Sequence, residues 1–340
     1  PTRELAAQIQ KNIRDYSEFL NIKSAVIFGG VKQNAQVATI RQGVDILVAT
    51  PGRLLDLHQQ RLVNLSHVEI LVLDEADRML DMGFLKDIRK ILNLLPQDRQ
   101  NLMFSATYSN DIRTLAKSFL NNPVQVEVTP KNTAVEIILQ KAYRVDKADK
   151  YNILFQLIKE ENWDQALIFT RTKHGANRLA EKLSKKGHST AAIHGNKSQN
   201  QRTKALDSFK KGTVKILVAT DIAARGIDIP LLPHVVNFEL PNVAEDYVHR
   251  IGRTGRAGAE GAAISLVDIE EVAYLRSIEK LIGNRIEMHT IDGYEAKNTV
   301  PLGKAAKSKS QGKGGPRSGG NRSKKPFGNR NRSNNTGRRN

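Results

Sequence analysis

Three carboxyl side chains directly follow an apolar segment. Residues 68–73 are almost entirely apolar, and they run into Asp74-Glu75-Ala76-Asp77. Carboxylates at the end of a buried strand are costly unless a cation or specific donors compensate them. Mg²⁺ bound to nucleotide phosphates would be such a cation, with Asp74 holding it through water and Glu75 orienting an attacking water. The alternative is a strand that exits into a solvated acidic turn, and this segment alone does not decide between them.

Further polar groups follow other apolar segments. Ser105-Ala106-Thr107 puts two hydroxyl groups after one, and residues 215–220 run into Asp221-Ile-Ala-Ala-Arg-Gly-Ile-Asp228. The segment from His249 to Arg256 spaces three arginines by three residues, with glycines between them. Arginines three apart can share one face, and such a fork suits bidentate capture of phosphate oxygens. The alternative for this segment is a solvated basic turn.

Apolar segments of strand length alternate with segments of helical period, which is typical of a doubly wound α/β fold. Several strands are apolar on both faces, which predicts parallel sheets flanked by helices, with ligand groups at the carboxyl ends of the strands. The predicted strands are 44–50, 68–74, 101–107, 166–170, 190–194, 215–220, 234–238 and 262–267. The predicted helices are 3–19, 85–94, 111–120, 151–160, 175–186, 199–210 and 270–281.

A polar stretch at 128–136 interrupts this alternation and predicts a linker between two domains. We predict a first domain at 1–128, a linker at 129–136, a second domain at 137–291 and a tail at 292–340. From Lys297 to Asn340 there are 13 Lys or Arg residues and no acidic residue, out of a net charge of +18 for the 340 residues. Such a segment cannot bury enough apolar surface to fold, so we expect a disordered tail.

The charge and composition narrow the class of partner. A strongly basic arm suits a polyanion, and because no amphipathic stretch or lipidation motif favours a membrane, we expect nucleic acid. The chain has no cysteine, which excludes disulfides, thiolate zinc sites and cysteine nucleophiles and fits a reducing cytoplasm. No apolar run approaches the roughly 20 residues that span a bilayer.

Nine short motifs in order resemble those of the DEAD-box RNA helicases, from Pro1 to about Ile291. In the first half they are Pro1-Thr-Arg-Glu-Leu-Ala-Ala-Gln8, Gly29-Gly30, Thr50-Pro-Gly-Arg53, Asp74-Glu-Ala-Asp77 and Ser105-Ala-Thr107. In the second half they are Leu167-Ile-Phe-Thr-Arg171, Gln199-Asn-Gln-Arg202, Thr220–Asp228 and His249–Arg256. The segments Ile193–Ser198, Leu232–Phe238 and Asp246–His249 look most like the bacterial RhlE-type branch.

The resemblance implies an ATP-dependent enzyme that unwinds short RNA duplexes, with two RecA-like domains and with ATP and Mg²⁺ as cofactors. It assigns the magnesium ion to Asp74, water activation to Glu75, the ribose to Asp228 and the γ-phosphate to Arg253 and Arg256. Coupling of nucleotide state to domain closure would fall to Asp77, Ser105, Thr107 and His249. The implied RNA-binding residues are Arg3, Gly30, Thr50, Arg53, Arg171, Gln199, Arg202, Thr220 and Gly226. These residue types suit sugar–phosphate contacts, so binding should be largely independent of RNA sequence.

One part of the family pattern is missing. The sequence contains no Gly-x-x-x-x-Gly-Lys-Ser/Thr phosphate-binding loop, which the family places, with a glutamine motif, before Pro-Thr-Arg-Glu. We therefore expect no meaningful ATPase activity from the chain as given. We also expect an unstable first domain with apolar edges exposed beside Val68–Asp74, and a second domain that folds independently.

Other functions compete with the helicase. A passive RNA-binding or annealing protein would use the basic arm and the second domain, and a DNA translocase would share the two-domain engine. Partners among ribosome-assembly or RNA-decay proteins are possible. The aromatic residues Tyr16, Phe19 and Phe28 are predicted to be core residues and not base-stacking platforms. His194 and His249 lack the further ligands of a zinc site.

Overall fold

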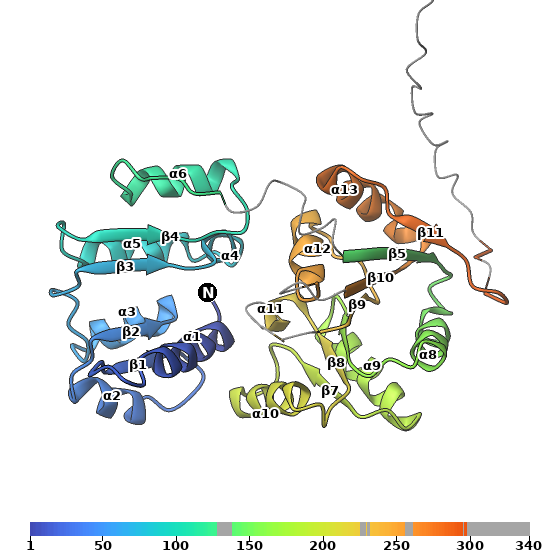
Figure 1. Cartoon of the computed structure of the whole chain (residues 1–340), viewed down its shortest axis with the longest axis horizontal. Coiled ribbons are helices and arrows are strands. Elements are labelled where there is room, and N and C mark those ends of the chain that lie inside the picture. Colours follow the sequence, from blue (N-terminus) through green and yellow to red (C-terminus); the bar gives the residue numbers. More distant parts are fainter. Residues whose placement is uncertain (128–137, 225–228, 230–231, 256–260, 295, 298–340) are drawn as a thin grey trace, which may run out of the picture. The chain divides into compact units, whose positions relative to one another are not determined.

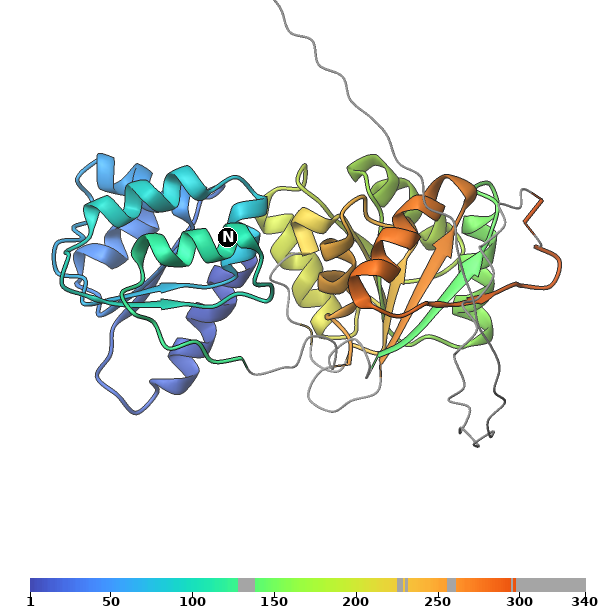
Figure 2. The ribbon, with the colours of Figure 1, turned by 90° about the horizontal axis from the view of Figure 1, so that it is seen from above.

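The computed structural model describes residues 1–127, 138–224, 229, 232–255, 261–294 and 296–297 (Figures 1 and 2). The predicted linker at 129–136 and nearly all of the predicted basic tail lie outside the described residues. Among the described residues, no helix has the length and apolarity that a membrane crossing requires.

The first half contains two pairs of parallel strands. Strand β1 (Ser24–Ile27) pairs with β2 (Ile46–Ala49), and β3 (Ile70–Leu73) pairs with β4 (Gln100–Met103). The helices of this half are α1 (Arg3–Tyr16), α2 (Asn34–Arg41), α3 (Pro51–Gln59), α4 (Ala76–Asp81), α5 (Leu85–Leu94) and α6 (Asn110–Phe119). The strands predicted at 44–50, 68–74 and 101–107 are therefore present, each shorter than predicted.

The second half contains one parallel sheet of seven strands in the order β11-β5-β10-β9-β6-β8-β7 (Figure 1). The strands are β5 (Ile138–Arg144), β6 (Ala166–Phe169), β7 (Thr190–Ile193), β8 (Ile216–Ala219), β9 (His234–Asn237), β10 (Gly261–Val267) and β11 (Glu287–His289). The helices are α8 (Lys150–Glu160), α9 (Lys173–Lys185), α10 (Gln199–Lys210), α11 (Asp221–Ala224), α12 (Ala244–Ile251), the 3₁₀ turn η1 (Ile269–Glu271) and α13 (Val272–Ile282). The predicted α/β fold is confirmed.

Helices cover both faces of this sheet, as the strands β6 and β8, which are apolar at every position, require. Strands β6 and β8 are buried at all four residues each. Successive side chains of a strand point to opposite faces. Ile168 accordingly packs in a core with α8 and α9, whereas Leu167 packs in a second core with α10 and α11. Strand β5, together with α12 and α13, encloses a third core around Tyr247.

Polar side chains start several of these helices. The hydroxyl of Thr172 accepts a hydrogen bond from the Gly175 amide at 3.0 Å, and Ser198 forms a capping box with Gln201. Such caps compensate the free amides of the first helical turn. They fix the ends of α9 and α10, which follow β6 and β7 respectively.

The first half leaves apolar side chains in contact with solvent. Ile70 and Val72 of β3 are 56% and 50% exposed, and Phe104 after β4 is 55% exposed. The sequence predicted an exposed apolar edge beside residues 68–74, and these residues confirm it. Two of the three predicted core aromatic residues are not buried, so that prediction is wrong for them: Tyr16 is 81% and Phe19 is 92% exposed. Helix α1 ends at Tyr16, so Phe19 lies in the turn beyond the helix and has no face to pack against; Phe28 is half-buried.

Candidate functional site

Asp74 and Glu75 form a sharp turn between β3 and α4. Glu75 has a left-handed backbone with φ of +50°, and its amide donates to Asp74 Oδ1 at 2.9 Å. A left-handed conformation costs a residue other than glycine about 1 kcal/mol. The turn directs two carboxylates to the carboxyl end of β3, where the sequence predicted them.

The environment of Glu75 is suited to a cation or a water molecule. Burial raises the pKa of the Glu75 carboxyl, while the positive charge of Arg253 acts in the opposite direction. Glu75 Oε2 is buried and has no hydrogen-bond partner among the described residues. Carboxylate oxygens are what Mg²⁺ prefers, and Mg²⁺ typically keeps several waters and needs only one or two carboxylates beside the phosphates. The two acids therefore fit a magnesium nucleotide, although no cluster of three ligating side chains occurs in the described part of the chain.

The four predicted coupling residues form a continuous set of contacts. Asp77 Oδ2 accepts hydrogen bonds from the amide and the hydroxyl of Thr107, both at 3.1 Å. The Ser105 hydroxyl donates to the Thr107 carbonyl at 2.7 Å. His249 Nε2, on α12, lies 3.6 Å from the same Asp77 oxygen. Burial, followed by the charge of Arg78, lowers the pKa of His249 to about 4.

Arg253 is the predicted arginine finger that the structure describes. It is 8% exposed, and its Nε donates to the His249 carbonyl at 3.2 Å. This bond holds the arginine to the end of α12. The other predicted nucleotide residues, Asp228 and Arg256, lie outside the described residues, as does Gly226.

An ion pair beside these residues was not predicted. Arg78 is 2% exposed, and its Nη1 lies 2.6 Å from Asp246 Oδ1 of α12 and 3.3 Å from Asp81 Oδ2. Asp246 precedes His249 by one helical turn. The pair therefore joins α4 to α12 next to the contact of Asp77 with His249, and nothing in the sequence spacing connects two residues so far apart.

Arg3 and Gly30, both predicted to bind RNA, lie against each other. Gly30 has φ of +80°, and a Cβ atom added there would lie 2.1 Å from Arg3 Nη1. Glycine is the residue that tolerates both the conformation and this close approach. Arg3 Nη1 also donates to Gln199 Oε1 at 3.2 Å, which links α1 to α10.

Glu4 joins the same residues and was not predicted. Its two carboxylate oxygens accept from Gln199 Nε2 at 2.8 Å and from Arg202 Nη2 at 2.9 Å. Glu4, Gln199 and Arg202 are each less than 9% exposed to solvent. Glu4 occurs inside the first predicted RNA-binding motif, but its acidic type gave no reason to select it.

The remaining predicted RNA-binding residues of the first half surround the segment after β1. Thr50 precedes α3, and its amide donates to the Ile27 carbonyl at 3.0 Å. Arg53 donates to Gln36 Oε1 at 3.2 Å and to the Val31 carbonyl at 3.3 Å. Arg53 therefore lies beside the Gly29-Gly30 turn. In the second half, Thr220 follows β8, and its carbonyl accepts from the amides of Ala223 and Ala224.

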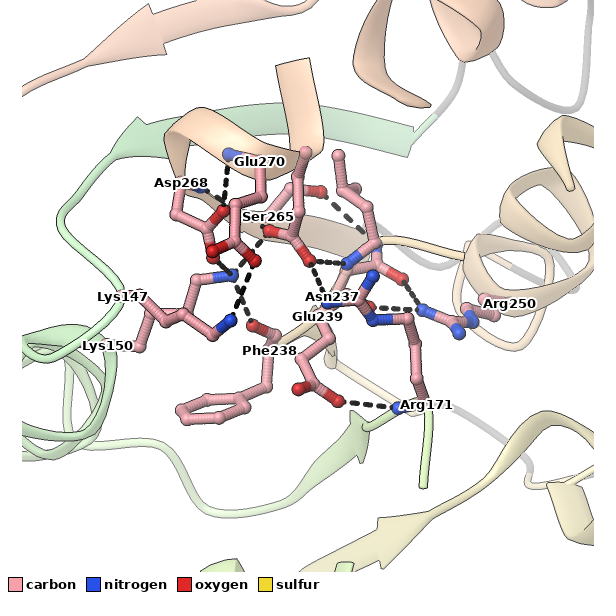
Figure 3. A network of polar contacts seen from close by, with 12 residues as sticks. Lys147, Lys150, Arg171, Asn237, Phe238, Glu239, Arg250, Ser265, Asp268 and Glu270 are labelled. Carbon is pink, nitrogen blue, oxygen red and sulfur yellow. Dashed lines mark hydrogen bonds and ion pairs between the residues drawn. The ribbon is translucent and has the colours of Figure 1, made fainter. Parts of the chain in front are cut away.

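Arg171 follows β6 and belongs to a polar network at the carboxyl edge of the seven-stranded sheet (Figure 3). Its amide donates to Glu239 Oε2 at 2.7 Å, and its Nη2 lies 3.4 Å from Glu271 Oε1. Arg250, the first arginine of the arginine-rich segment, is 2% exposed and pairs with Asp221, the closest contact being 2.5 Å from its Nε. Arg250 also donates to Asn237 Oδ1 at 3.1 Å. Arg250 is thus a buried structural residue and not a phosphate fork.

The histidines at 194 and 249 contact other polar side chains. His194 Nε2 lies 2.9 Å from Asn177 Oδ1, and burial lowers the pKa of His194. His249 contacts Asp77 as described above. Neither belongs to a cluster of three ligating side chains in the portion of the chain that the structure describes.

Two family models match this chain. Residues 1–115 match "DEAD/DEAH box helicase", and residues 149–258 match "Helicase conserved C-terminal domain". The ATP-dependent RNA helicase RhlB of Pseudomonas syringae pv. tomato is 43% identical over 293 residues, which are 85% of this chain and 74% of that protein. DEAD-box ATP-dependent RNA helicase 30 of Arabidopsis thaliana is 41% identical over 96% of this chain and 54% of its own length.

Solved structures show the same relationship. S. cerevisiae Dbp5 bound to RNA and ADP BeF3 has a TM-score of 0.76 and 36% identity, over 86% of this chain and 75% of that one. Mss116p bound to ssRNA and AMP-PNP has a TM-score of 0.79 and 29% identity, over 86% of this chain and 63% of that one. The similar bacterial proteins carry the name RhlB, so the predicted RhlE-type branch is not confirmed. These matches, together with the two RecA-like α/β domains, establish that the chain belongs to the DEAD-box family of ATP-dependent RNA helicases.

Proposed function

We propose that both halves of this chain form part of an ATPase that remodels RNA, with Asp74 and Glu75 of the first half at the nucleotide. The observation that carries the proposal is the set of contacts from Ser105 through Thr107 and Asp77 to His249. This set runs from the carboxyl end of β4, next to the two acids, to the helix that holds Arg253. A change in nucleotide state at the acids would therefore reach α12 through this set of polar contacts.

In this proposal the chain's own residues bind and orient the nucleotide. Asp74 would hold a magnesium ion through water, and that ion would supply neutralisation of phosphate charge. Glu75 orients the attacking water through its unpartnered oxygen, and Arg253 stabilises charge on the γ-phosphate. Asp228 and Arg256 keep the roles that the resemblance gives them, at the ribose and the γ-phosphate.

RNA is the proposed substrate. Arg3, Gly30 and Arg53 lie near one another in the first half, and Gln199 and Arg202 contact Arg3 and Glu4. Thr50, Arg171, Thr220 and Gly226 complete the proposed set. Dbp5 and Mss116p are both known bound to RNA, and the proposed contacts here are of residue types that bind the sugar–phosphate backbone. A cytoplasmic location, and partners in ribosome assembly or RNA decay, belong to the same proposal.

The segments 193–198, 232–238 and 246–249 support the RhlE-type branch, and a tree built with RhlE and RhlB proteins of many bacteria tests that assignment. The sequence lacks the phosphate-binding loop, so the 340 residues as given bind RNA without turning over ATP. In that form they act as the passive RNA-binding protein of the alternative prediction.

The test joins this chain to an amino-terminal segment that carries the family's Gly-Lys-Thr loop. The chain alone should bind single-stranded RNA and release no phosphate from ATP, whereas the fusion should show RNA-stimulated turnover. Glu75→Gln in the fusion should lower turnover about 100-fold or more, because it removes the group that orients water. A fusion that binds RNA tightly but never hydrolyses ATP would favour the passive protein, and equal stimulation by DNA would favour a translocase.

The basic tail is proposed to tether RNA. Truncation of the chain after Ala296 removes 13 positive charges and no negative one. The truncated chain should bind RNA more weakly, and its affinity should depend less steeply on salt, because fewer counterions are released. Binding isotherms of the two chains at several salt concentrations measure both quantities, and an unchanged salt dependence would refute the tether.

A further inference from the structure

A buried ionic cluster lies beside Arg171 at the carboxyl edge of the seven-stranded sheet (Figure 3). Lys150, the first residue of α8, is 3% exposed, and its ammonium group contacts both Asp268, at 3.0 Å, and Glu271. It also donates to the Phe238 carbonyl at 3.1 Å. Two buried carboxylates thus face one buried ammonium, and the cluster needs a second positive charge to be balanced.

Arg171 supplies that charge from a more exposed position. Its side chain is 25% exposed, while Glu271 is fully buried, and the ion pair between Nη2 and Oε1 spans 3.4 Å. The guanidinium group also lies 5.8 Å from the ring centre of Tyr274 on α13. Arg171 is therefore held between a buried carboxylate and an aromatic ring, with part of its surface left open.

The backbone around Glu271 fixes the position of its carboxylate. Oε1 accepts from the Leu240 amide at 3.0 Å, and Oε2 lies 3.4 Å from the Asp268 amide in the capping box of η1. Burial raises the pKa of Glu271, while the charge of Lys150 acts against that shift. A carboxylate held by two amides and an ammonium cannot follow a moving arginine, so it defines where the guanidinium stays.

We infer that Glu271 is a positioning residue that presents the Arg171 guanidinium to an RNA phosphate. The inference rests on the proposed RNA contact of Arg171, which follows β6 as Thr220 follows β8 at the same edge of the sheet. Glu271 lies beyond residue 258, where the match to the family model ends. An arginine held in place before binding loses less side-chain entropy when it meets a phosphate.

Glu271 could position Arg171 or only neutralise its charge, and the substitution Glu271→Gln gives opposite changes in RNA affinity for these two roles. If Glu271 merely neutralised Arg171, then Glu271→Gln would add net positive charge near the RNA and tighten binding. If Glu271 positions Arg171, the same substitution should weaken binding about threefold to tenfold, because a free arginine side chain must then be ordered by the RNA. The sign of the change therefore separates the two roles.

Asp268→Asn is the matched control. It removes the same charge from the same ammonium group, but no ion pair of Arg171 with Asp268 occurs among the described contacts. The full chain and its variants are titrated into fluorescein-labelled single-stranded oligouridine, and anisotropy gives the affinity at several salt concentrations. Asp268→Asn should leave the affinity within about twofold of the unsubstituted chain, because Arg171 keeps its contacts with Glu271 and Tyr274.

A double substitution tests whether Glu271 affects RNA binding through Arg171. Arg171→Ala should weaken binding and lower the salt slope by roughly one, as for one lost phosphate contact. Glu271→Gln combined with Arg171→Ala should bind no more weakly than Arg171→Ala alone. If Glu271→Gln does not fold, Tyr274→Leu removes the second support of Arg171 without touching the buried charges and should also weaken binding.

Several outcomes would overturn the inference. These are tighter binding by Glu271→Gln, equal losses with Asp268→Asn, full additivity with Arg171→Ala, or, where Glu271→Gln does not fold, no loss with Tyr274→Leu. RNA binding that persists unchanged in Arg171→Ala would overturn it while leaving the proposed function in place. A chain that binds no RNA at all would overturn both.

Discussion

At the scale of single residues, the fold keeps the imidazole of His249 neutral at pH values at which a free histidine is protonated. Its imidazole is buried beside Arg78 and Arg253, and it also faces the carboxylates of Asp77 and Asp246. Burial is the largest cause that lowers its pKa to about 4, and the charge of Arg78 adds to it. The neutral ring is therefore the form that contacts Asp77 in the folded chain.

This depressed pKa predicts a stability that depends on pH. The unfolded chain takes up the proton near pH 6.5 and the folded chain only near pH 4, so the free energy of unfolding should fall as the pH drops between about 6.5 and about 4. Above that window this histidine should contribute no pH dependence. Urea unfolding across this range should show a smaller loss for His249→Gln than for the unsubstituted chain. His67→Gln, at an exposed histidine, is the control, and parallel profiles for all three chains would contradict the prediction.

Residue types and order predicted the chemical groups but not their partners. Asp77, Thr107 and His249 were selected from short motifs, and the structure brings them into contact. Glu4, Arg78 and Glu271 were missed, because what distinguishes them is a contact with a residue about 120 to 200 positions away. Sequence spacing reports neighbours on one helix or strand, and these contacts connect different elements. The roles at Asp228 and Arg256 stay predictions.

At the scale of elements, the apolar pattern of the sequence predicted the central strands of the seven-stranded sheet but not the strands β5 and β11 toward one of its edges. Strands β6 and β8 are buried on both faces, so they read as continuous apolar runs. Strand β5 mixes buried, half-buried and exposed positions and contains Gln140 and Lys141. It follows the polar stretch at 128–136, which predicts a linker and not a strand. Strand β11 is only three residues long. Both lie toward one edge of the sheet, where part of each strand faces solvent.

Helix α12 was missed for a different reason. Its eight residues include His249 and Arg250, which were interpreted as part of a phosphate-binding segment and not as a helix. The helix nevertheless buries Tyr247 and Ile251 in the third core. Beyond it, Gly255 has φ of +65°, and a Cβ atom there would lie 2.7 Å from Ile138 of β5. At least one glycine of the arginine-rich segment therefore allows a close approach of the chain to the sheet.

At the scale of the whole chain, the two halves bury the apolar side chains of their strands to different degrees. The first half has two separate pairs of strands with Ile70 and Val72 half exposed, whereas the second half has one seven-stranded sheet with three buried cores. Burial of apolar surface is the main term that stabilises a fold, at about 25 cal/mol per Å². The first half should therefore be the less stable of the two.

Urea should consequently unfold the chain in two steps. Trp163 is the single tryptophan, it is 5% exposed, and it lies in the first of the second half's cores. Far-UV circular dichroism should show an early transition from the first half that tryptophan fluorescence does not detect, and a later one that both probes follow. Residues 138–297 prepared alone should reproduce the later transition at the same midpoint.

Because the urea slope grows with the surface exposed, coincident transitions with a slope fitting the whole chain would mean that the halves unfold as one unit. In that case contacts such as Arg78 with Asp246 and Glu4 with Arg202 would bind the halves more strongly than the exposed strands weaken the first.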